Sequence, residues 1–127
     1  MLEVKKVRNK NGFIQYDVYL TRGDSAYITL EVNGIEPTSE DIVRCQVRDV
    51  PTTGDLIIDG EIIREDSEFI WYIRPQDTNE LTPGEYYWDA EIEVVESDDV
   101  FTFVPVSKFV LLDESTLPQD TQEEVDG

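Results

Sequence analysis

Apolar and polar residues alternate with a period of two along most of this 127-residue chain. That period is expected of β-strands, whose successive side chains point to opposite faces of a sheet. The clearest run is 85–95, which places Tyr86, Trp88, Ala90, Ile92 and Val94 on one face and Glu85, Asp89, Glu91 and Glu93 on the other. Further runs cover 13–20, 26–32, 42–49, 68–74 and 100–112. In the last of these, Pro105 predicts an edge, a bulge or a break.

Turn-forming residues separate these runs at intervals of about ten residues, a spacing typical of sandwiches and barrels. Strict alternation predicts antiparallel sheets that each bury one face, and two such sheets bury those faces against each other. We therefore predict an all-β fold, an antiparallel, immunoglobulin-like β-sandwich of seven to eight strands. Helix is predicted only as single turns at 75–81, with Asp77 or Thr78 as N-cap, and at 38–42.

The segment "LTPGEYYWDAEI" has the pattern of a structural corner that leads into a central strand. Its corner residues are Leu81, Pro83, Gly84 and Tyr86. Proline fixes the bend, glycine allows a positive φ, and the tyrosine ring covers the end of the core. We expect the hydroxyl of Tyr86 to hydrogen-bond back to the corner backbone, with Tyr87 on the outside.

The segment "TRGDSAY" contains an Arg-Gly-Asp triplet, which in animal systems serves as a receptor adhesion signal. Gly23, Asp24 and Ser25 are also turn-forming residues between two alternating runs. We predict a hairpin turn here, and adhesion is the less favoured interpretation.

Charge divides the chain into three parts. Residues 1–12 hold four basic and one acidic residue (+3), residues 13–112 hold six and 22 (−16), and residues 113–127 hold none and six (−6), for a net charge of −19. We interpret these as a basic N-terminal segment, the β-sandwich domain and an acidic C-terminal tail, which is not expected to fold free in solution.

Such a charge repels nucleic acid and anionic membranes, so neither is expected as a partner. No apolar run approaches the roughly 20 residues of a membrane helix, and the N-terminus lacks the apolar core of a secretory signal. The charge favours a basic partner surface, although the simpler interpretation is that the acidic residues keep the fold soluble.

Candidate chemistry is sparse. Histidine is absent, which removes histidine-based metal sites and catalytic triads. Acidic residues are numerous enough for chance pairs, but no insertion that would form a cleft is visible, so we expect no enzyme and no cofactor. The loops around 59–68 and 96–99 offer oxygens for calcium, yet neither has the spacing of a dedicated site. The single cysteine, Cys45, is expected to be a small buried apolar residue.

Three tyrosines, Tyr27, Tyr72 and Tyr87, lie opposite the apolar faces of their strands. Aromatic side chains are enriched in interface cores, although they also suit strands for local reasons. They are the candidate interface residues.

The order of these motifs resembles small immunoglobulin-like proteins encoded among the structural genes of tailed phages and prophages, especially those of Gram-positive bacteria. The resemblance covers about residues 13–116 and departs from the family pattern at Trp88, usually a tyrosine, and at 51–66, which is long and acidic. The matching positions are Gly23, Asp24, Ser25, Val43 to Arg48, Pro75, Asp77, Thr78, Leu81, Gly84, Tyr86, Asp89, Phe109, Leu111, Glu114 and Thr116.

The resemblance implies a non-enzymatic virion protein of the tail, baseplate, neck or head surface, made in the bacterial host cytoplasm. Its partners would be other virion proteins, with many copies in a symmetric assembly. The alternative is a carbohydrate- or cell-surface-binding module, in which acidic loops hold calcium and tyrosines stack on sugar.

Overall fold

A computed structural model of the chain describes residues 1–66 and 68–113. Within these residues the chain forms nine strands and one helical turn. The strands are β1 (Leu2–Arg8), β2 (Ile14–Thr21), β3 (Ala26–Leu30), β4 (Ile42–Arg48), β5 (Leu56–Asp59), β6 (Glu61–Glu65), β7 (Glu68–Ile73), β8 (Gly84–Val94) and β9 (Asp99–Leu112), and the helical turn is α1 (Pro75–Thr78).

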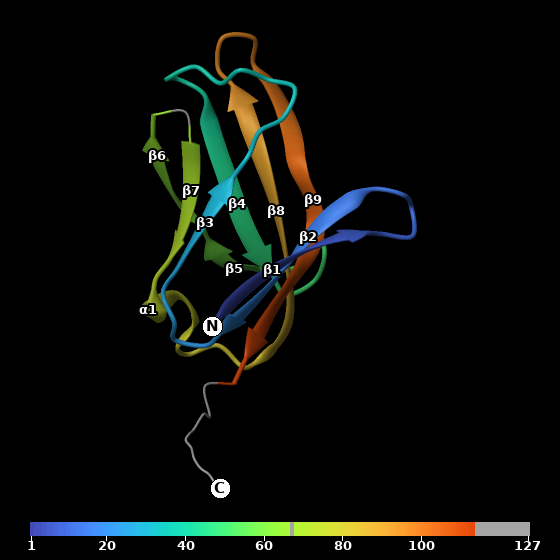
Figure 1. The fold of residues 1–127 in the computed structure, drawn as a ribbon, viewed down its shortest axis with the longest axis vertical. Coiled ribbons are helices and arrows are strands. Elements are labelled where there is room, and N and C mark those ends of the chain that lie inside the picture. The colour runs from blue at the N-terminus through green and yellow to red at the C-terminus, as the bar shows by residue number, and fades with distance from the viewer. Residues whose placement is uncertain (67, 114–127) are drawn as a thin grey trace, which may run out of the picture.

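The strands form two sheets that pack face to face (Figure 1). The larger sheet has the order β1-β2-β9-β8-β4-β5, and the smaller has the order β3-β7-β6. The all-β prediction is confirmed, whereas the expected seven to eight strands are too few. Of the strand pairs in the described chain, all are antiparallel except β2 with β9, which is parallel from Val18↔Phe109 to Thr21↔Leu112.

The core lies between the sheets and is centred on Trp71 of β7. Its ring centroid lies 5.1 Å from that of Trp88 on β8 and 5.8 Å from that of Phe109 on β9. Trp88 also donates from Nε1 to the carbonyl oxygen of Tyr16 at 2.9 Å. Cys45 is fully buried beside this core, and burial raises the pKa of its thiol, so it is a buried apolar residue as expected.

A bulge interrupts β9 at Pro105, one of the three outcomes expected for this proline. Ser107 pairs with Trp88, whereas Val104 already pairs with Ala90, so β9 contains one extra residue between these pairs. The buried hydroxyl of Ser107 donates to the carbonyl oxygen of Pro105 at 2.8 Å and accepts from the backbone of Tyr16 at 3.0 Å. These bonds satisfy backbone groups that the bulge removes from the sheet.

Glycines lie at two of the points where the chain passes between the sheets. Gly60 separates β5 from β6, and its N–H donates to the Cys45 carbonyl oxygen at 2.7 Å. A Cβ at Gly60 would lie 2.7 Å from that same oxygen, so the crossing needs glycine. Gly23, with φ of 86°, lies between β2 and β3, which belong to different sheets. The predicted hairpin at this point is wrong, because the parallel pairing with β9 holds β2 in the larger sheet.

The helical turn at 75–78 is capped differently from the prediction. Arg74 is the N-cap, and the carboxylate of Asp77 accepts from its backbone N–H at 2.8 Å. Neither Asp77 nor Thr78 is therefore the N-cap. At 38–42 the chain forms a hydrogen-bonded turn in place of a helical one, in which the Asp41 carboxylate accepts from the Thr38 N–H at 2.9 Å.

The three predicted parts of the chain map differently onto the structure. Residues 1–12 contain β1 and the turn to β2, so the larger sheet begins before residue 13. The acidic tail lies outside the described residues from 114 onward. No helix in the described chain is long and apolar enough to span a membrane.

Candidate binding surfaces

The corner residues meet at the start of β8. The hydroxyl of Tyr86 donates to the carbonyl oxygen of Thr82 at 2.7 Å, which is the bond expected of this tyrosine. Gly84 has φ of 151°, in the region that favours glycine. Leu81 and Tyr86 are partly buried against the core. The corner therefore closes one end of the core.

The Arg-Gly-Asp triplet is engaged in contacts of the fold. The N–H of Gly23 donates to the hydroxyl of the buried Thr78 at 2.9 Å, and Nη1 of Arg22 donates to the carbonyl oxygen of Leu81 at 3.2 Å. The carboxylate of Asp24 forms an ion pair with the amino group of Met1. All three residues thus connect β2 to α1, to the corner or to β1, which favours the turn interpretation.

Two of the three candidate tyrosines lie together on the outer face of the smaller sheet. Tyr27 and Tyr72 are cross-strand neighbours whose rings stack with centroids 4.6 Å apart and planes 8° apart. The guanidinium of Arg74 lies 4.9 Å from the Tyr72 ring centroid and forms an ion pair with Glu61 of β6. Tyr27 lies on the edge strand β3, and Arg74 follows directly after the central strand β7. The stack ends in the Tyr27 ring, which is 61% exposed at the edge strand β3.

Tyr87 lies apart from this pair, on the outer face of the larger sheet. Its hydroxyl donates to the Glu85 carboxylate at 2.8 Å, and this bond raises the pKa of Tyr87. The three tyrosines therefore do not form one surface, because β8 and the β3–β7 pair belong to opposite sheets.

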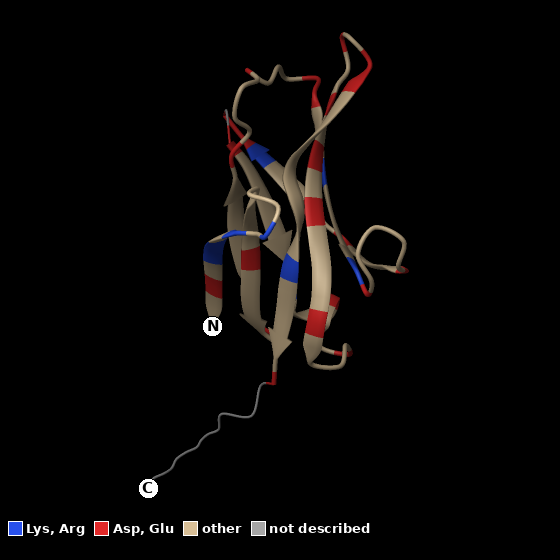
Figure 2. Ribbon diagram, turned by 90° about the vertical axis from the view of Figure 1, so that its right-hand side faces the viewer, with Lys and Arg blue, Asp and Glu red and all other residues tan. Residues whose placement is uncertain are grey.

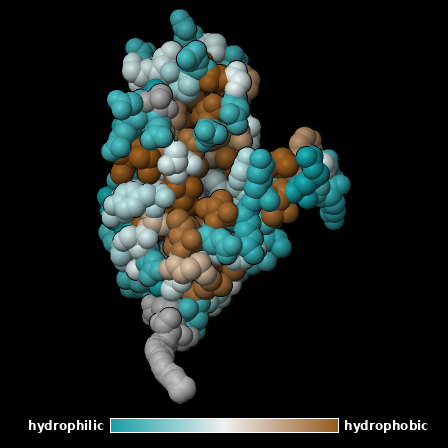
Figure 3. Space-filling view, in the orientation of Figure 1, coloured by the Kyte–Doolittle hydropathy of each residue, from teal (hydrophilic) through white to brown (hydrophobic). Residues whose placement is uncertain are grey.

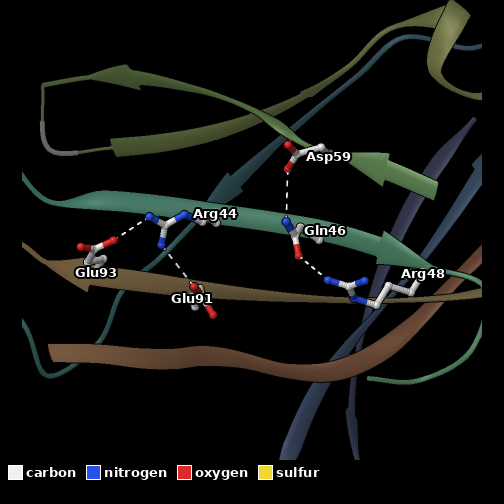
Figure 4. Close-up of polar contacts among 6 residues, drawn as sticks. All are labelled: Arg44, Gln46, Arg48, Asp59, Glu91 and Glu93. Atoms are coloured by element: carbon white, nitrogen blue, oxygen red, sulfur yellow. Dashed lines mark hydrogen bonds and ion pairs between the residues drawn. The ribbon is translucent and has the colours of Figure 1, made fainter. Parts of the chain in front are cut away.

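The outer face of β4, β5 and β8 carries a ladder of paired polar side chains (Figure 4). Arg44 donates to Glu93 at 2.6 Å and to Glu91 at 3.2 Å. The next outward position on β4, Gln46, donates to Asp59 at 3.4 Å and accepts from Arg48 at 2.7 Å. Arg44 is thus paired with two of the acidic side chains of this face. The alternation in the sequence predicts that these acidic residues lie on an outer face, but it does not predict their pairing with side chains of β4.

Asp89 is an acidic side chain of this face with a raised pKa. Burial is the main cause, and Arg48 acts in the opposite direction. Asp89 lies with Tyr87 and Arg48 around a hollow of about 10 Å³, room for roughly one water molecule. Such a space has no room for a substrate.

In the described part of the chain, including residues 59–66 and 96–99, no group of three or more acidic or cysteine side chains is arranged to hold an ion.

The basic residues of the N-terminus follow one another along an exposed edge strand, in contrast to the acidic body (Figure 2). We call the side chains of β1, together with Lys10 in the following turn, the β1 surface. Its basic members are Lys5, Lys6, Arg8 and Lys10. The sequence shows the charge of this segment, but its weak alternation did not identify it as a strand.

An apolar groove of about 340 Å³ opens between the edge strand β3 and the larger sheet. Val4, Tyr16, Ile28, Leu30 and Phe103 contribute to its walls. Figure 3 shows apolar side chains exposed on this face of the molecule. Because the smaller sheet has three strands and the larger has six, part of the inner face of the larger sheet remains uncovered here. Sequence reasoning did not find this groove.

No protein-family model matches the chain, and no curated protein matches it significantly.

Proposed function

We propose that this protein is a non-enzymatic structural or accessory component of a phage particle, which binds neighbouring virion subunits through the outer surfaces of an immunoglobulin-like sandwich. The biological setting rests on the sequence resemblance in residues 13–116. The protein would be located in the virion, where many copies of it would form part of a symmetric assembly.

The single observation that supports a binding role is the separation of charge between the β1 surface and the body. Three basic side chains project from one exposed edge strand, while the body carries most of a net charge of −19. Opposite potentials on different parts of one molecule orient partners and steer their association. A protein that needed charge only for solubility would not require such a separation.

The test measures incorporation into particles made by a bacterium that carries the coding sequence in a phage genome. Deleting residues 1–12 would remove β1 and leave β2 as a new edge, so charge reversal is the cleaner change. The variant Lys5→Glu/Lys6→Glu should remain folded and be depleted from purified particles. The control Lys108→Glu alters one charge on the outer face of β9 and should be incorporated normally. If wild-type protein is absent from purified particles, the proposal is wrong.

A second candidate, a carbohydrate-binding module, is favoured by the stack of Tyr27, Tyr72 and Arg74, because an exposed ring face at the end of a rigid stack suits a sugar ring. Titration with oligosaccharides should then shift the Tyr27 and Tyr72 ring resonances, and Tyr27→Ala should abolish the shifts. Melting with calcium and with chelator tests the calcium-assisted form, since an ion bound only to the native state raises the melting temperature.

A further inference from the structure

The inner face of β1 is exposed although that of its neighbour β2 is buried. Val4 pairs with Val18, and Leu2 pairs with Leu20. Val18 and Leu20 are fully buried, whereas Val4 is 42% and Leu2 is 38% exposed. The difference arises because β1 is the outermost strand and no strand of the smaller sheet lies over it.

The outer edge of β1 offers a defined set of backbone groups. The N–H of Thr21 donates to the Met1 carbonyl oxygen, and the N–H of Asn9 donates to the Phe13 carbonyl oxygen. Hydrogen-bonded pairs alternate along an antiparallel ladder, so the odd-numbered residues of β1 face β2. The N–H and C=O groups of Leu2, Val4, Lys6 and Arg8 therefore point to the open side.

Within the described chain, the basic side chains of the β1 surface form no ion pair, whereas three basic side chains elsewhere do. Arg44 pairs with two glutamates, Arg74 pairs with Glu61, and Lys108 pairs with Glu85. In the described part of the chain, by contrast, no ion pair involves Lys5, Lys6 or Lys10. Lys5 lies over the Tyr19 ring, 5.1 Å from its centroid.

We propose that the open edge of β1 binds an extended acidic segment of a neighbouring protein chain, which adds to the larger sheet as a seventh strand. Strand addition uses the four outward backbone positions for affinity and side-chain pairs for specificity. Acidic side chains of the segment would pair with Lys5, Lys6 and Arg8, and apolar side chains would cover Leu2 and Val4 beside the groove. The inference rests on the proposed function in that it names the kind of partner.

A second copy of β1 fits this edge less well than an acidic strand. Each β1 holds three basic residues and one acidic residue, so two paired β1 strands would bring an excess of like charge together, which destabilises a sheet. The competing explanation is that the basic residues only prevent edge-to-edge aggregation, a common role of lysine on edge strands. The two explanations differ in whether any strand of suitable charge binds.

The probe is a capped synthetic peptide, Glu-Thr-Glu-Glu-Val-Thr-Val, written to pair antiparallel with β1. Its first, third and fourth residues would lie opposite Arg8, Lys6 and Lys5, and its two valines opposite Val4 and Leu2. The matched control peptide replaces the three glutamates with glutamines and keeps the apolar positions. The chain is used at full length, and amide hydrogen exchange and NMR shifts are measured during titration.

The acidic peptide should protect the amides of Leu2, Val4, Lys6 and Arg8 from exchange, because these N–H groups gain acceptors. The amides of Glu3, Lys5 and Val7 should change little, because they already bond to β2. The glutamine peptide should bind about tenfold more weakly, as expected for the loss of three partly exposed ion pairs. The variant Lys5→Gln/Lys6→Gln should weaken binding of the acidic peptide, whereas Lys108→Gln should not.

Three results would overturn the inference. They are an absence of binding, binding without protection of the four outward amides, and equal affinity for the two peptides. The inference is also wrong if the four amides are protected in the free chain and lose this protection when the chain is truncated after Asp113. Those two results would mean that the edge of β1 is occupied by the chain's own C-terminal residues and not by a neighbouring protein. Failure of the peptide assay with normal particle incorporation would reject the strand addition alone, and the reverse would reject the virion role alone.

Discussion

Strands β8 and β1 lie in the same sheet, but they differ in burial and in how many of their side chains have partners. β8 is central, with Trp88, Ala90 and Ile92 buried on one face and acidic residues paired with β4 on the other. β1 is an edge strand with both faces largely exposed and its lysines unmatched in the described chain. Folding thus uses nearly every group of β8 and leaves most groups of β1 available.

The difference separates residues that hold the fold from residues that remain free to bind. A group that already has a partner gains little from a new one, because it must first lose the old interaction. Backbone and charged groups at an exposed edge bond to water, which a partner strand can replace without breaking an interaction within the protein. Binding is therefore expected on the β1 side of the molecule and stability on the β8 side.

Truncating one inward side chain on each strand should give the largest contrast. Trp88→Ala removes a buried indole and its bond to the Tyr16 carbonyl oxygen, and should cost about 3–5 kcal/mol in the free energy of unfolding. Val4→Ala, on an exposed position of β1, should cost less than about 1 kcal/mol. Urea denaturation followed by circular dichroism measures both.

If Trp88→Ala fails to fold, Trp88→Phe provides a milder version of the same test. Trp88→Phe should still cost more than Val4→Ala, because it loses a buried hydrogen bond and leaves a cavity in the core. That cavity is smaller than the one left by Trp88→Ala. A loss for Val4→Ala equal to that for Trp88→Phe would contradict the division between the two strands.

Two adjacent tyrosines of β8 allow a smaller and more local comparison. Tyr86→Phe removes the bond to the Thr82 carbonyl oxygen and should cost about 1 kcal/mol in the free energy of unfolding. Tyr87→Phe removes a bond between two outward side chains, Tyr87 and Glu85, and should change stability by less than about 0.5 kcal/mol. Equal effects in urea denaturation would show that the corner bond has no special role.

Strands with one buried face could be predicted from the sequence. The alternation of β3, β4, β7 and β8 identifies them, because burial on one side imposes a period of two. The corner was also predictable, since Pro83, Gly84 and Tyr86 act through local backbone geometry.

Strands that lack this alternation could not be predicted from the sequence. β1 has no buried face, and β5 and β6 are short strands within an acidic stretch. The assignment of strands to sheets also escaped local reasoning, because the pairing of β2 with β9 joins residues about 90 positions apart. For the same reason the sequence identified three outward tyrosines without showing that Tyr87 lies on the opposite sheet from the other two.

The smallest effects concern pH and compare two acidic side chains of the body. Bonds from the Thr38 backbone lower the pKa of Asp41, so this group stabilises the fold above its unfolded pKa of about 4 and loses that effect as the pH falls through the folded value. Burial raises the pKa of Asp89, so its contribution is greatest below about pH 4 and is lost as the pH rises through the folded value.

Asp41→Asn should therefore destabilise the protein at pH 7, and the loss should shrink in acid. Asp89→Asn should stabilise it at pH 7, with a gain that vanishes below about pH 4. Asp99→Asn removes the same charge from an exposed position and controls for the net charge of the chain. Urea denaturation between pH 3 and pH 7 measures all three. If Asp89→Asn follows the control at every pH, then burial of this carboxyl does not influence stability, and the opposing charge of Arg48 offsets the effect of burial.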